Sequence, residues 1–158
     1  MIPAAGEIHG DTRWITRVLG VPGHLTLAQS ITRARLRAML RGAIVAESLR
    51  LGAVVEGVPL VVRKLERIDA GVREQPPQWT LLWFEADEAD ADRLAVALAD
   101  ALEANGGWYA DFHSDAEVTV VFAGRIFRYS RGDDTERAKV ADYARSVGVP
   151  EEQLDWAE

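Results

Sequence analysis

The sequence predicts an α+β fold: an antiparallel or mixed sheet of five or six strands with two helices on one face, plus an N-terminal helical arm. Two observations support this prediction. Short segments in which apolar and polar residues alternate predict strands, whereas apolar residues spaced three and four apart predict helices. With 48% hydrophobic residues, the chain of 158 residues has enough apolar material for one core of ordinary size.

The first predicted element is a helix over residues 25–41, which has an apolar stripe at helical spacing. Three arginines share another face of this helix at four-residue spacing: Arg33, Arg37 and Arg41. Gly42 is the expected helix stop. The chain is therefore expected to divide into a basic N-terminal arm with one helix, residues 1–41, and a compact α+β domain, residues 42–158.

Three strands and a helix are expected next. The strands are predicted at 43–49, Val58–Ile68 and Trp79–Glu85, although 43–49 could also extend the arm helix. Asp87 is a suitable N-cap for the helix that follows, because its carboxylate can accept a hydrogen bond from a free N–H of the first turn. The residues expected on the buried side of this helix are Leu94, Leu98 and Leu102.

The segment from Gly106 to Tyr129 is predicted to be a three-stranded meander. A two-residue turn at Ala123-Gly124 would pair Phe122 with Arg125, Val120 with Phe127 and Val118 with Tyr129. A three-residue loop at 114–116 would pair Phe112 with Val118 and Ala110 with Val120. One face would then be apolar and contain Trp108, Phe112, Val118, Val120, Phe122, Phe127 and Tyr129. The other face would contain Tyr109, Asp111, His113, Glu117, Thr119, Val121, Ile126 and Arg128.

The last predicted helix begins after Asp133, which forms a capping box with Glu136. Gly148 ends it, and Pro150 can start a final helical turn. The short tail after that turn is expected to return an aromatic side chain to the core. Three tryptophans are predicted to be core residues: Trp83, Trp108 and Trp156.

Three segments carry a resemblance to a known family: GGWYADFHS, VVFAGRIFRYSRGD and YARSVGVPEEQLDW. With Ile44–Leu49 and Val58–Leu60, they resemble a family of small bacterial proteins to which no activity is assigned. The similarity runs from about Gly42 to Trp156. The resemblance implies a compact domain and transfers no catalytic residue to this chain.

The best candidate for a catalytic or metal site is a group of three residues on the mixed face of the meander: Asp111, His113 and Glu117. Asp111 and His113 are two apart on one strand and point the same way, and Glu117 is expected opposite His113 across the hairpin. A histidine between two carboxylates could act as a general base or a metal ligand. The alternative is a solvated sheet face with ordinary cross-strand charge pairs, and the sequence favours it because it shows no nucleophile and no pocket.

The same face is also a predicted contact surface, because Tyr109, Val121, Ile126 and Arg128 mix apolar and charged side chains as interfaces do. We therefore expect a non-catalytic interaction module that binds a protein partner or itself, with a homodimer as one form. A small hydrolytic or metal-assisted enzyme is the first alternative. No cofactor is predicted, because Gly106-Gly107 opens a strand rather than a helix and so does not match a dinucleotide-binding loop.

Charge separates the two parts of the chain. Residues 1–53 have seven arginines and three acidic residues, whereas residues 54–158 have eleven basic and twenty-two acidic residues. Nucleic-acid binding is therefore a second alternative only through the basic arm, where Arg33, Arg37 and Arg41 would contact the polyanion or a protein partner. The chain has no cysteine, no apolar run long enough for a membrane and no signal-peptide pattern, so a cytoplasmic location is expected.

Overall fold

The computed structural model describes residues 38–71, 75–154 and 156. The strands in this part of the chain are β1 (Met39–Val45), β2 (Val61–Asp69), β3 (Gln78–Asp87), β4 (Ala110–His113), β5 (Glu117–Phe122) and β6 (Arg125–Ser130). The helices are α2 (Ala91–Ala101) and α3 (Asp134–Ser146), with three short 3-10 turns η2 (Ala46–Ser48), η3 (Glu88–Asp90) and η4 (Glu151–Gln153). None of the helices described is long and apolar enough to cross a membrane.

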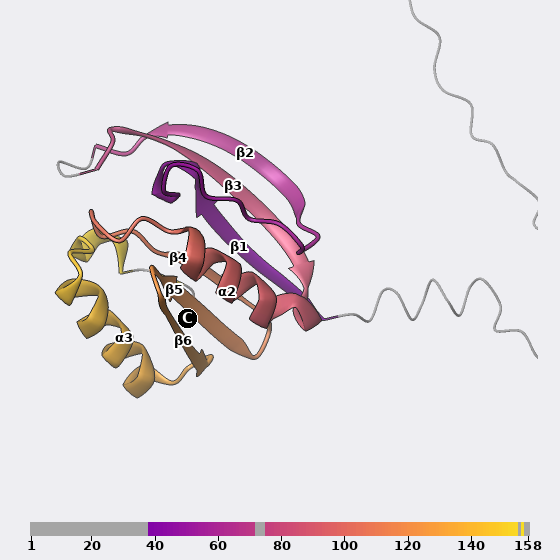
Figure 1. Ribbon diagram of the computed structural model, residues 1–158. Helices are drawn as coiled ribbons and strands as arrows, with labels where there is room; N and C mark the ends of the chain where they lie inside the picture. The colour runs from indigo at the N-terminus through magenta and orange to yellow at the C-terminus, as the bar shows by residue number, and fades with distance from the viewer. Residues whose placement is uncertain (1–37, 72–74, 155, 157–158) are drawn as a thin grey trace, which may run out of the picture. The chain divides into compact units, whose positions relative to one another are not determined.

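The strands form one antiparallel sheet in the order β2-β3-β1-β4-β5-β6 (Figure 1). β1 lies in the middle of the sheet because it pairs with β3 on one side and with β4 on the other. A six-stranded antiparallel sheet with two helices confirms the predicted α+β class.

The pairing of the meander differs from the prediction in one hairpin. The β5–β6 pairs are as predicted, with Val120 opposite Phe127. Between β4 and β5, however, Phe112 lies opposite Thr119, one residue away from the predicted partner. The cause is a four-residue turn in which the Ser114 N–H donates to the Glu117 carbonyl at 2.9 Å and the Ser114 hydroxyl accepts from the N–H groups of Ala116 and Glu117 at 3.2 Å each.

This shift of one residue exchanges the faces of β5 and β6 relative to β4, because side chains alternate along a strand. Val121 and Thr119 lie on the same face as Phe112, which we call the α2 face. Val118 and Val120 lie on the same face as Asp111 and His113, which we call the α3 face. The predicted separation into one apolar and one mixed face is therefore wrong, and both faces of the meander are largely apolar.

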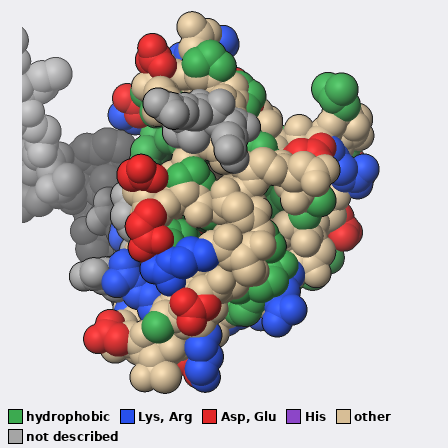
Figure 2. All heavy atoms as spheres, turned by 90° about the vertical axis from the view of Figure 1, so that its left-hand side faces the viewer, with side chains coloured by type: hydrophobic (Ala, Val, Ile, Leu, Met, Phe, Trp, Pro, Cys, Tyr) green, Lys and Arg blue, Asp and Glu red, His purple; other side chains and the backbone are tan. Residues whose placement is uncertain are grey.

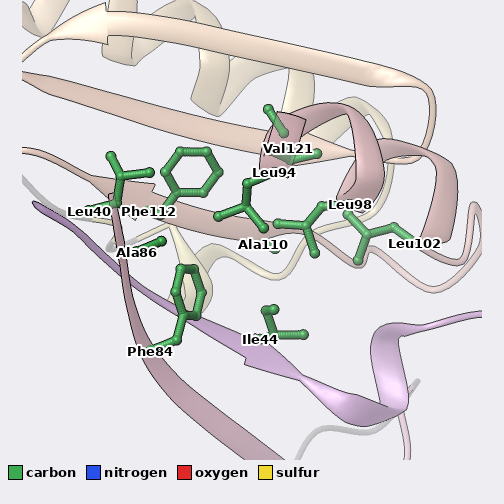
Figure 3. Close-up of a cluster of buried hydrophobic side chains, with 11 residues drawn as sticks. Leu40, Ile44, Phe84, Ala86, Leu94, Leu98, Leu102, Ala110, Phe112 and Val121 are labelled. Atoms are coloured by element: carbon green, nitrogen blue, oxygen red, sulfur yellow. The ribbon is translucent and has the colours of Figure 1, made fainter. Parts of the chain in front are cut away.

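The two helices cover opposite faces of the sheet, which corrects the expectation that both lie on one face. Figure 1 shows β5 and β6 between α2 and α3. Leucines of α2 point at Phe112 and the side chains around it, as Figure 3 shows. The buried residues of this α2 core are Leu40, Ile44, Phe84, Ala86, Leu94, Ala95, Leu98, Leu102, Ala110, Phe112 and Val121. β5 has apolar side chains on both faces of the sheet, so each face needs a helix to bury them.

On the α3 face, α3 packs against β5 and β6 through Val140 and Ala144. The rest of this α3 core consists of Val118, Val120, Phe122, Tyr129, Val149 and Trp156. Trp156 is 3% exposed, so the C-terminal tail returns to the core as predicted. Asp133 caps α3 as predicted, because its carboxylate accepts a hydrogen bond from the Glu136 N–H at 3.0 Å. Asp87 accepts from the Ala89 N–H at 3.0 Å and so caps η3, whereas the N-cap of α2 is Asp90.

The start of the domain differs from the predicted boundary. β1 begins at Met39, and Leu40 is buried in the α2 core, so the expected division between residues 41 and 42 falls inside a strand. Arg41 likewise lies on a strand, where a helix over 25–41 was predicted. Gly42 pairs with both Phe84 and Phe112 in the middle of the sheet, and it does not end a helix. The rest of the predicted arm, including Arg33 and Arg37, lies outside the described residues.

Candidate functional site

A cleft of about 740 Å³ lies on the α3 face, over β1, β3 and β4. The helix α3 packs on β5 and β6 of this face, and the cleft occupies the neighbouring half of the sheet. One part of its wall comes from the C-terminal tail, through Glu152, Gln153 and Trp156. The aromatic residues of the lining are Trp79, Trp83, Phe84, Trp108, Tyr109 and Trp156.

The floor of the cleft changes from polar to apolar along the strands. Directly paired residues share a face, so the floor consists of rows that cross the sheet. These rows are, in order, Glu85–Arg41–His113, Trp83–Ala43–Asp111 and Leu81–Val45. We call the first row, together with Arg63, the polar end, and we call Leu81, Val45, Trp79 and Trp108 the apolar end.

At the polar end, two arginines share one carboxylate. Nε and Nη2 of Arg63 both donate to Glu85 Oε2, at 2.7 and 2.5 Å, and Arg41 Nε lies 3.6 Å from Glu85 Oε1. Arg63 is the extra residue of an irregularity in β2, where the pairing with β3 shifts between Val62 and Lys64. The hydrogen bonds from Arg63 hold the pKa of the Glu85 carboxyl below its usual range, and the charges of Arg63 and Arg41 act in the same direction.

His113 completes the polar end. Its Nδ1 atom is buried and has no hydrogen-bond partner among the described residues. Burial of the imidazole lowers the pKa of His113, and the charges of Arg131 and Arg41 lower it further, whereas Asp115 acts in the opposite direction. These effects favour the neutral form of the imidazole.

At the apolar end, the aromatic side chains are held by contacts with one another and with the tail. The rings of Trp79 and Trp108 lie 5.5 Å apart, and those of Tyr109 and Trp156 lie 5.4 Å apart. The Tyr109 hydroxyl donates to the Gln153 carbonyl at 2.5 Å, which fastens the tail beside the cleft. The position of these rings is therefore set by the folded domain before any ligand binds.

The structure brings together two of the three predicted catalytic or metal-binding residues. Asp111 and His113 both line the cleft. Glu117 does not join them, because His113 pairs with Val118 and the side chain of Glu117 belongs to the opposite face. Glu117 instead lies 4.0 Å from Arg128 on the α2 side of the sheet. Among residues 38–71, 75–154 and 156, no group of three or more His, Asp or Glu side chains is placed to hold a metal ion.

The residues of the predicted contact surface are divided between the two faces. Tyr109 and Arg41 line the cleft. Val121 is fully buried under α2, Ile126 packs against the same core, and Arg128 forms an ion pair of 2.6 Å with Asp92 of α2. The surface that the sequence suggested is therefore not continuous.

Four residues that line the cleft were not predicted as site residues: Trp79, Trp83, Arg63 and Glu85. Trp83 was expected in the core, but it is 40% exposed because the core side of β3 is occupied by Phe84. The alternation of Trp79, Leu81, Trp83 and Glu85 is the sequence signal for the three residues that lie on β3. It places three large apolar side chains and a charge on one side of a single strand.

Comparisons with known proteins add no functional assignment. No protein-family model matches the chain, and no curated protein or solved structure matches it. On the face of the molecule drawn in Figure 2, basic and acidic side chains lie beside one another and alternate with hydrophobic ones. The cleft and its two ends are therefore the features from which a function can be inferred.

Proposed function

We propose that this domain is a non-catalytic binding module, and that it binds a small, mainly apolar ligand in the cleft on the α3 face. The observation that carries this proposal is the hollow, aromatic character of the cleft. Its volume of about 740 Å³ falls within the range of small-molecule sites, roughly 300–1,000 Å³. Such sites combine apolar and aromatic walls with a few polar groups that orient the ligand, and this cleft has the same composition.

Exposed tryptophan supports a binding role for this surface. Trp83 is 40% exposed although it lies at the centre of the floor, and Lys64 lies over its ring at 5.9 Å from the ring centre. A large aromatic side chain on an open sheet face exposes apolar area that a bound ligand would remove from water. The other side of the same strand is buried under α2, so Trp83 contributes little to the core of the domain.

A small hydrolytic enzyme is the second candidate, and one observation favours it. Asp111 and His113 line the same cleft, and the lowered pKa of His113 leaves a neutral imidazole that could accept a proton. Hydrolysis of p-nitrophenyl esters that is lost in His113→Ala, while binding of an apolar probe persists, would support this alternative. We favour binding alone because Glu117 lies on the other face.

A protein partner, self-association and nucleic-acid binding through the basic arm stay predictions. Val121 and Ile126, which were expected in a contact surface, are occupied by contacts with α2. The small-ligand proposal instead uses side chains that line the cleft, among them Trp79 and Trp83.

The proposal is tested with the neutral fluorescent probe N-phenyl-1-naphthylamine. We expect saturable binding of this probe to the full chain, with energy transfer from the tryptophans that line the cleft. Leu81→Gln should weaken binding several-fold, because it places an amide at the apolar end. Leu65→Gln is the matched control, since Leu65 is also a strand leucine but is 67% exposed on the other face of the sheet. Absence of saturable binding, or equal effects of the two substitutions, would reject the cleft as a binding site.

A further inference from the structure

The polarity of the cleft floor specifies the chemistry of the ligand, provided that the proposed binding function holds. The polar end and the apolar end lie at opposite ends of the same three strands. From Glu85 to Trp79 along β3 the floor extends over seven residues, and the six steps between them span about 20 Å of strand. A ligand that fills this length meets charged groups at one end and aromatic rings at the other.

The polar end has two positively charged side chains and one negatively charged side chain. Arg41 and Arg63 present two guanidinium groups, and Glu85 is the one carboxylate that both of them contact. The side chains of these arginines are 59% and 60% exposed, whereas that of Glu85 is 22% exposed. A guanidinium group has five N–H donors, so both arginines keep donors for a second acceptor. Asp111 lies one row further along the strands and has an interaction of its own.

We propose that the ligand is a small amphipathic carboxylic acid. Its carboxylate binds Arg41 and Arg63 at the polar end, and its apolar body lies along the floor toward Trp79 and Trp108. Arginine suits this role because its planar N–H donors match the two oxygens of a carboxylate. Glu85 is the one carboxylate in that row, because the third paired residue is His113.

An acid fits the polar end better than an amine does. A cationic head group would approach two guanidinium groups and compete with them for Glu85, which is the less exposed partner. An anionic head group adds a second carboxylate to a pair of arginines that already shares one. Electrostatics therefore orients the ligand with its head at the start of β1 and its apolar body toward the C-terminal tail.

The test compares two ligands of equal chain length, dodecanoate and dodecan-1-ol, by displacement of N-phenyl-1-naphthylamine below their aggregation concentrations. Binding of the alcohol reports on the cleft, and the ratio of the two affinities reports on the head-group site. We expect the acid to bind at least about tenfold more tightly than the alcohol, the ratio that corresponds to one charge-assisted hydrogen bond. The double variant Arg41→Gln/Arg63→Gln should reduce this ratio to about one.

A variant with the opposite effect strengthens the test. Glu85→Gln removes the carboxylate that competes for both arginines, so it should increase the ratio of the affinity for dodecanoate to that for dodecan-1-ol several-fold. Arg67→Gln is the matched control, because Arg67 is an exposed arginine of the same strand β2 that contacts Gln78 on the other face of the sheet. This control should leave both affinities as they are in the unmodified chain.

Each failure has a distinct meaning. Equal affinities for acid and alcohol would overturn the head-group assignment and leave the cleft as a binding site. Tighter binding of dodecyltrimethylammonium than of dodecanoate would also overturn it, in favour of a cationic ligand. If neither the acid nor the alcohol displaces the probe, and the probe itself does not bind, the proposed function fails together with this inference.

Discussion

Gly42 is the residue that allows β1 to approach β4 closely in the centre of the sheet. A Cβ atom at this position would lie 2.5 Å from the Asp111 carbonyl oxygen and 2.6 Å from Phe112 Cβ. Neither contact is sterically possible without movement of the backbone. Glycine here therefore serves close packing between segments that are far apart in the sequence.

His113 makes stability depend on pH. Burial, followed by the charges of Arg131 and Arg41, lowers the pKa of the imidazole in the folded chain from the usual value of 6.5. The unfolded chain therefore binds this proton at a higher pH than the folded chain does. Stability from the neutral imidazole is fully present above the unfolded pKa and is lost as the pH falls toward the folded pKa.

We expect the free energy of unfolding to decrease below about pH 6.5, and we expect His113→Gln to remove part of this decrease. Urea unfolding of both proteins between about pH 8 and pH 5 measures the difference. Parallel pH profiles for the two proteins would show that His113 titrates alike in the folded and unfolded chains.

At the scale of elements, the hairpin β4–β5 decides which side chains reach the core. The turn around Ser114 takes four residues, so Val121 points toward α2 and is fully buried. In the register expected from sequence, the same residue would lie on a mixed, solvated face. A substitution at this position therefore distinguishes the two registers.

Val121→Asp is expected to destabilise the domain by several kcal/mol, because a buried carboxylate beneath α2 has no partner. Arg125→Asp on β6, which is exposed, is the comparison and should cost far less. Chemical denaturation measures both. A loss below about 1 kcal/mol for Val121→Asp would favour the register predicted from sequence.

Local sequence rules account for much of the fold and for little of the site. The cap at Asp133 and the hairpin β5–β6 depend on residues close in sequence, and they were predicted correctly. The hairpin β4–β5 depends on a serine side chain that closes its turn, which alternation alone does not reveal. The cleft depends on how much of one sheet face α3 covers, and that is a tertiary property.

The candidate site shows the same limit of local sequence rules, at Glu117 and at Arg63. Asp111 and His113 were placed on one face by strand alternation, and both line the cleft. Glu117 was attached to them by a register that was wrong by one residue. Arg63 reaches Glu85 from an irregularity in β2, and no local pattern in the sequence predicts that irregularity.

At the scale of the whole domain, the C-terminal tail links the α3 core to the cleft. Trp156 is buried in that core and also lines the cleft, and its ring contacts Tyr109. The tail is tied to the rest of the domain by the side chain of Gln153, which donates to Gln75 at 3.1 Å, and Gln75 donates to the Gly106 carbonyl at 2.7 Å. The C-terminal tail therefore contributes both to the stability of the domain and to the proposed ligand site.

Two tryptophan substitutions should separate these roles. Trp156→Ala is expected to cost about 3–5 kcal/mol, the usual loss for a buried aromatic side chain, and to weaken probe binding. Trp83→Ala should weaken probe binding with a loss of stability below about 1 kcal/mol, because the ring is half-exposed. Thermal unfolding and probe titration on the same samples give both quantities. Equal losses of stability would show that Trp83 belongs to the core after all.

The irregularity in β2 has a consequence for how the protein behaves at high concentration. β2 is an edge strand, and several of its apolar side chains are exposed, including Val61, Val62 and Leu65. A regular edge of this kind invites further strands to add to it, which is the first step of aggregation. The extra residue at Arg63 interrupts the regular ladder of backbone groups, and the charges that follow it repel a copy in register. We therefore expect the residue that is proposed to hold a ligand's carboxylate also to hinder the addition of further strands at the open edge of the sheet.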